Sequence, residues 1–100
     1  MNLTSTKFSQ YVLLDRPLLH SRQVVVKFPN NFGASIIRGD YTYGGSKGLY
    51  EIGVIIFDKS GEDFSLTYTT SITDDVLGYL TEEEVLNTLE KIFALKETRP

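Results

Sequence analysis

Hydrophobic and polar residues alternate over four short stretches of the chain, which is the pattern of β-strands with one buried face. These stretches are Arg22 to Phe28, Ala34 to Arg38, Leu49 to Phe57 and Phe64 to Ile72. The first two flank a short turn, and the last two flank a polar turn, so each pair is predicted to form an antiparallel hairpin.

The stretch from Leu49 to Phe57 is apolar on both faces beyond Val54. A strand that is covered on both faces belongs in the middle of a sheet. Gly53 interrupts it, and a glycine there predicts either a bulge or the close approach of a neighbouring element. In the last strand, every second residue from Phe64 to Tyr68 is expected to point inward.

The C-terminal part of the chain predicts one amphipathic helix from about Glu82 to about Lys96. Thr81 and Glu84 have the spacing of a capping box, and Leu80 before the cap is placed to form a hydrophobic staple. Helical spacing aligns five apolar residues into one stripe that faces the sheet: Val85, Leu86, Leu89, Ile92 and Phe93.

Three shorter segments complete the prediction. The apolar run Tyr11 to Leu14 is interpreted as a short strand, with a helical segment as the alternative, and Asp15-Arg16-Pro17 is expected to end it because proline lacks an N–H. Thr73 to Tyr79 predicts a turn or a single helical turn, and residues 1–10 predict a loose lead-in.

The predicted fold is α+β, a single domain over residues 1–100 with a three- to four-stranded antiparallel sheet and one C-terminal helix on one face.

Composition excludes several kinds of site. The chain has no cysteine and only one histidine, His20, so disulfides, thiolate nucleophiles and ordinary zinc sites are excluded, and no metal or other cofactor is predicted. His20 is interpreted as a surface or interface residue. No stretch approaches the roughly 18 apolar residues of a membrane helix, and Met1 to Gln10 lacks a secretion signal. A cytoplasmic location is therefore expected, without contact to a membrane.

The net charge of −3 is unevenly distributed. Residues 1–57 hold six basic and three acidic residues, whereas residues 58–100 hold four basic and ten acidic ones. The chain therefore lacks a domain-wide positive field for a nucleic-acid backbone, and nucleic acid is not an expected partner.

The segment from Gly39 to Gly48 contains four glycines and no aliphatic residue, so it predicts a loop. Glycines let a backbone approach a ligand, tyrosines offer flat contact area, and cations can hold a phosphate or carboxylate. The candidate binding residues in and beside this loop are Arg38, Asp40, Tyr41, Tyr43, Lys47 and Tyr50. A plain flexible connection is the alternative. Arg38-Gly39-Asp40 spells an adhesion tripeptide, which we interpret as chance in a chain without a secretion signal.

A second candidate is an acidic patch around the start of the predicted helix. Its residues are Asp74, Asp75, Glu82 and Glu83, followed by Glu84. Paired carboxylates can bind a divalent cation, act as acid and base, or meet a basic partner surface. The favoured interpretation is structural, because acidic residues in a first turn stabilise a helix.

Three sequence stretches carry a resemblance: FGASIIRG (32–39), YGG followed by GLYE (43–51) and TDDVLGYLTEEEV (73–85). Together they resemble a group of small, functionally uncharacterised proteins encoded by bacteriophages and prophages. The resemblance implies the cytoplasm of an infected bacterium as the setting. It carries over no catalytic residues.

These observations lead to three hypotheses. The first is a non-enzymatic protein that binds and inhibits a bacterial host or defence protein through the loop and an adjoining strand edge. The second is a protein that sequesters a nucleotide or another small anionic ligand through the same residues. The third is a single-strand nucleic-acid binder that stacks bases on Tyr41, Tyr43 and Tyr50. No constellation of residues indicates an enzyme, and the apolar Tyr11 to Leu14 and Leu18-Leu19 are compatible with a homodimer.

Overall fold

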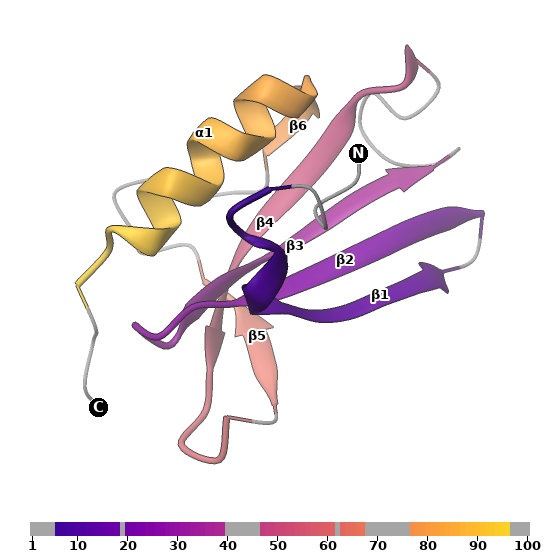
Figure 1. Ribbon diagram of the computed structural model, residues 1–100. Helices are drawn as coiled ribbons and strands as arrows, with labels where there is room; N and C mark the ends of the chain where they lie inside the picture. Colours follow the sequence, from indigo (N-terminus) through magenta and orange to yellow (C-terminus); the bar gives the residue numbers. More distant parts are fainter. Residues whose placement is uncertain (1–5, 19, 40–46, 62, 68–76, 97–100) are drawn as a thin grey trace.

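The computed structural model describes residues 6–18, 20–39, 47–61, 63–67 and 77–96. One helix lies across one face of an antiparallel sheet (Figure 1). The strands are β1 (Val12–Leu18), β2 (Ser21–Lys27), β3 (Phe32–Gly39), β4 (Tyr50–Phe57), β5 (Phe64–Leu66) and β6 (Leu77–Leu80), and the helix is α1 (Glu82–Phe93). The predicted α+β class and the C-terminal helix packed on the sheet are confirmed.

Strand β4 is an interior strand with hydrogen-bonded neighbours on both edges, as its apolar faces predicted. The strand order is β1-β2-β3-β4-β5, and β6 also pairs with β4. The second edge of β4 is shared, since Ile55–Phe57 pairs with β5 while Tyr50 and Ile52 pair with β6. Gly53 pairs with Ser35 in an unbroken register. Of the two alternatives predicted for Gly53, a bulge or a close approach, the bulge is absent from its pairing with β3.

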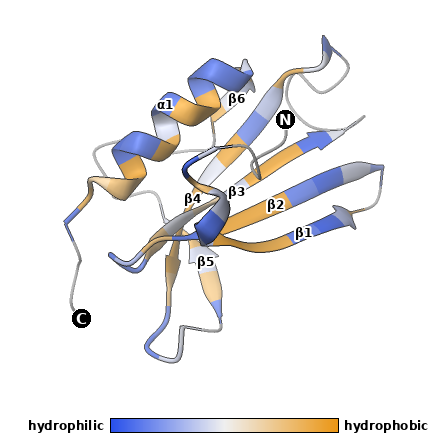
Figure 2. Cartoon of the chain, in the orientation of Figure 1, coloured by the Kyte–Doolittle hydropathy of each residue, from blue (hydrophilic) through white to orange (hydrophobic). Residues whose placement is uncertain are grey.

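Strand β1 is longer than predicted. It continues through Asp15, Arg16 and Pro17, which we expected to end it, and Pro17 pairs with Arg22 of β2. In the described part of the chain β1 lies at the edge of the sheet, where proline is tolerated because one side of the strand makes no ladder hydrogen bonds. The strand changes from hydrophobic at its beginning to hydrophilic toward its end (Figure 2).

The face of the sheet under α1, here called the covered face, holds the main core. Its buried strand residues are Val26, Ala34, Ile36, Tyr50, Ile52 and Val54. The predicted helix stripe meets them, with Val85, Leu89 and Ile92 fully buried, whereas Phe93 stays 42% exposed at its end. In Figure 2 helix α1 alternates between blue and orange bands, as an amphipathic helix does.

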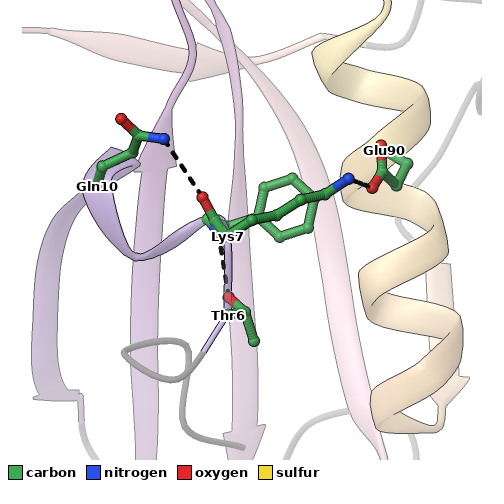
Figure 3. Close-up of polar contacts among 5 residues, drawn as sticks. Thr6, Lys7, Gln10 and Glu90 are labelled. Carbon is green, nitrogen blue, oxygen red and sulfur yellow. Dashed lines mark hydrogen bonds and ion pairs between the residues drawn. The ribbon is translucent and has the colours of Figure 1, made fainter.

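The N-terminal segment completes the cover beside the helix. The Phe8 ring lies 5.9 Å from the Phe28 ring, and the Tyr11 ring lies 5.2 Å from it. Lys7 forms an ion pair with Glu90 of α1, so the segment is joined to the helix (Figure 3). Among the described residues, α1 and the N-terminal segment therefore cover this face together.

Both ends of α1 are satisfied by side chains. The predicted capping box is present, with the Glu84 N–H donating to Thr81 Oγ1 at 3.2 Å and the Thr81 N–H donating to Glu84 Oε1 at 3.1 Å. At the other end, the Asn30 amide donates to the carbonyl oxygens of Ile92 and Leu95, each at 2.9 Å. The helix ends at Phe93, three residues before the predicted Lys96.

The segment before the helix differs from its prediction. Leu77–Leu80 is strand β6, where a turn or a single helical turn was expected, because its pairing with β4 satisfies its backbone in extended form. Tyr79 within it has a φ of 58°. Residues 73–76 lie outside the described residues, as do residues 68–72 of the predicted last strand.

Candidate functional site

The face of the sheet opposite α1, here called the open face, contains a groove with a volume of about 400 Å³. Strands β2, β3, β4 and β5 all contribute to it. Its lining residues are Gln23, Ser35, Ile37, Glu51, Gly53, Ile55, Phe64, Ser65 and Leu66. The part of the chain that the structure describes places no helix over this face.

The groove exists because small residues meet in the centre of the open face. Ser35 of β3 pairs with Gly53 of β4, while the next pairs on the same face are Ile37 with Glu51 and Gly33 with Ile55. Side chains stand roughly perpendicular to a sheet, so a serine opposite a glycine leaves a depression between larger neighbours. This pair forms the floor of the groove.

A chain of hydrogen bonds runs into that floor. Arg16 Nε donates to Gln23 Oε1 at 3.0 Å, and Gln23 Nε2 donates to Ser35 Oγ at 2.9 Å. Gln23 and Ser35 are only 7% and 8% exposed. Each keeps one unused donor hydrogen among the described residues, since Gln23 has a second amide hydrogen and the Ser35 oxygen acts here as an acceptor.

The wall at one end of the groove carries its charge. Glu51 is half-buried and, of the nine lining residues, is the charged one. None of the ion pairs between described residues involves its carboxylate. The groove therefore presents a negative charge beside an apolar surface.

The opposite wall is apolar. Phe64 packs against Phe57, with ring centroids 5.4 Å apart, and Leu66 pairs with Ile55. Phe64 and Leu66 were predicted to point inward. Their register with β4 places both on the open face, where Phe64 packs against a small buried cluster and Leu66 is 45% exposed. The wall therefore offers apolar surface to a ligand.

The predicted loop site is only partly described. Arg38 and Tyr50 come together at one end of the sheet, with the guanidinium 5.0 Å from the ring centroid and Nη1 donating to the phenol oxygen at 3.2 Å. Lys47 is exposed. Asp40, Tyr41 and Tyr43 lie outside the described residues.

Glu82 joins this end of the sheet to the helix, since the Tyr50 hydroxyl donates to Glu82 Oε1 at 3.4 Å. Burial raises the pKa of Tyr50 above its ordinary value, the Glu82 carboxylate raises it further, and the Arg38 guanidinium opposes both. Tyr50 of the predicted loop site is thus hydrogen-bonded to Glu82 of the predicted acidic patch, a contact that the sequence did not predict.

The predicted acidic patch is divided. Glu82, Glu83 and Glu84 occupy the first turn of α1, and Glu84 is engaged in the capping box. Asp74 and Asp75 lie outside the described residues. Within the described ranges, no group of histidine, aspartate and glutamate residues is arranged to hold a metal ion. His20 is exposed at the β1–β2 turn.

Comparison with known proteins gives no relative of this chain. No family model, no curated protein and no solved structure matches it. Among the described residues, no helix has the length and apolar character needed to cross a membrane. The groove and its chemistry are therefore the basis for a functional proposal.

Proposed function

We propose that this protein is a non-enzymatic binding protein that holds a small organic molecule in the groove of its open face. The observation that carries the proposal is the buried Gln23–Ser35 pair in the floor of an otherwise largely apolar groove of about 400 Å³. Ligand sites commonly have this size and combine apolar walls with a few placed polar groups.

The arrangement around Ser35 supports binding rather than catalysis. A nucleophilic serine needs a neighbouring base that accepts its proton. The neighbour of Ser35 is the Gln23 amide, which donates a hydrogen bond to Ser35 and is not a base. Ser35 is therefore suited to orient a ligand and lacks activation for attack.

A fragment screen by ligand-observed NMR tests this proposal, with hits located through the resonances of Ile37, Ile55 and Leu66. The Gly53→Val variant adds a branched side chain to the groove floor, and valine suits a strand. Gly53 is buried, so the added volume is expected to displace a ligand from the floor, and we expect the variant to lose the hits while remaining folded. Absence of hits at these residues, or their retention by a folded Gly53→Val variant, contradicts the proposal.

We also propose a second function, the binding and inhibition of a bacterial host or defence protein in the cytoplasm. It is favoured by Tyr79, which is 58% exposed and has a φ of 58°. A left-handed backbone at an aromatic residue is strained, and such strain is often retained at functional positions. Tyr79 immediately precedes Leu80, the residue that pairs with Tyr50.

The second function is tested with the Tyr79→Gly variant in a pull-down from bacterial lysate. Glycine adopts this backbone conformation freely, so the variant is expected to keep or slightly gain stability. It is expected to lose a partner that the wild type retains. Equal recovery of the same protein by both forms would count against Tyr79 as a contact.

A further inference from the structure

We propose that the groove recognises an organic cation, a protonated amine joined by a short chain to a flat apolar group. This inference rests on the proposed ligand-binding function of the groove and specifies the class of ligand. It is drawn from three features of the open face, namely the charge of Glu51, the shape of the apolar walls and the donors in the floor.

The first feature is the carboxylate of Glu51. It is half-buried in the groove wall, and no described residue forms an ion pair with it. Two cationic side chains of β1 and β2 form hydrogen bonds with other residues: Arg16 Nε donates to Gln23, and Lys27 donates to the Gly61 carbonyl oxygen at 3.2 Å. An ammonium group on the ligand supplies the missing charge, whereas an anionic ligand meets repulsion that partial burial strengthens.

The second feature is the spacing between charge and apolar surface. Glu51 and Gly53 lie two residues apart on β4, so about 7 Å separates them along the strand. A flat ring that lies over Gly53 therefore places an ammonium two or three bonds away within reach of Glu51. Ile37 borders this position on one side, and the Phe64 and Leu66 wall lies on the other.

The third feature sets the orientation of the ligand. The floor offers donor hydrogens from Ser35 and Gln23, which attract the negative face or an acceptor atom of a ring and repel an ammonium. The cationic end is therefore directed toward Glu51, away from the floor. Charge at the wall and donors at the floor thus select the same orientation.

The test uses three indoles that differ in the charge of one side chain: tryptamine as the cation, tryptophol as the neutral analogue and indole-3-acetate as the anion. Binding to the full chain is measured by NMR titration and calorimetry. We expect tryptamine to bind about tenfold or more tightly than indole-3-acetate, with tryptophol between them, because a charge-assisted hydrogen bond is made only by the amine. Raised salt should reduce this preference.

The Glu51→Gln variant is expected to lose the preference for tryptamine and to retain the affinity for tryptophol. Glu83→Gln removes the same charge at an exposed helix position outside the groove and should leave all three affinities unchanged. Equal affinity of the wild type for cation and anion overturns the cation inference while leaving the groove as a ligand site. Failure of all three indoles to bind overturns the inference too, and failure of the whole fragment screen removes the ligand-binding function with it.

Discussion

On the covered face, strands β2, β3 and β4 bring bulky aliphatic side chains together, whereas on the open face the same strands contribute Gln23, Ser35 and Gly53. The two faces therefore share one backbone and one set of hydrogen-bonded pairs. Along each strand, every second residue points to the covered face and packs against α1. The residues between them point to the open face, where some form the polar floor of the groove. The covered face thus carries the main core, whereas the open face carries the groove beside a smaller buried cluster of Val25, Ile55 and Phe57.

The largest expected loss of stability comes from a substitution in the core of the covered face. Ile52 has no exposed surface, so Ile52→Ala leaves a cavity under α1 and should lower the free energy of unfolding by about 3 kcal/mol. Ile37→Ala on the open face serves as the matched control and should cost less than about 1 kcal/mol, because its side chain is only partly buried. Urea denaturation measures both. Equal losses would contradict the division between the two faces.

The next effect concerns the floor of the open face. Gln23→Leu removes the donor to Ser35 and the acceptor of Arg16. It should lower the free energy of unfolding by about 1 to 2 kcal/mol, because the buried Ser35 hydroxyl loses its partner. Adding Ser35→Ala should recover part of this loss. A double-mutant cycle in urea measures the coupling, and additive losses would show that the two side chains do not act as a pair.

A smaller effect concerns Tyr50, a buried residue at one end of the covered face. Its pKa is raised from 10.0, so folding favours the neutral phenol, and the stability from this group is present below pH 10 and lost as the pH rises through the folded pKa. Tyr50→Phe should cost about 1 kcal/mol at neutral pH and make the loss of stability above pH 10 shallower. Denaturation across that pH range measures it, and an unchanged slope would contradict the assignment.

The smallest expected effect lies at the ion pair between Lys7 and Glu90, whose side chains are 67% and 48% exposed. Lys7→Ala should change the free energy of unfolding by less than about 0.5 kcal/mol, because exposed ion pairs are weak. Phe8→Ala beside it removes a buried ring and should cost about 3 kcal/mol. A loss for Lys7→Ala as large as that for Phe8→Ala would contradict this ranking of ion pair and buried ring.

The sequence was sufficient to predict the elements that are determined by residues close together along the chain. The capping box at Thr81 and the apolar stripe of α1 were predicted correctly because both depend on residues a few positions apart. Pro17 was misjudged because its effect depends on whether the strand lies at an edge, which is a property of the whole sheet. The end of α1 depended on Asn30, a residue distant in sequence.

The groove was not predicted, although parts of its signal are visible in the sequence. Gln23, Ser35 and Gly53 interrupt apolar strands at positions that face the same way, but only the register of β2, β3 and β4 shows that they meet. Phe64 and Leu66 were assigned to the core because alternation alone does not tell which side of the sheet the helix covers. The predicted loop residues Asp40, Tyr41 and Tyr43 remain predictions.

The amide of Asn30 has a consequence for how the molecule folds and opens. It lies in the turn between β2 and β3 and reaches the carbonyl of Ile92, 62 residues further along the chain. The amide reaches the carbonyl oxygens of Ile92 and Leu95 only when the hairpin and the helix are docked, so this cap on the last turn of α1 depends on tertiary structure. In the native protein, fraying of the final turn then requires release of Asn30. Hydrogen exchange in that turn should therefore report undocking of the helix from the hairpin and not independent fraying of the helix end.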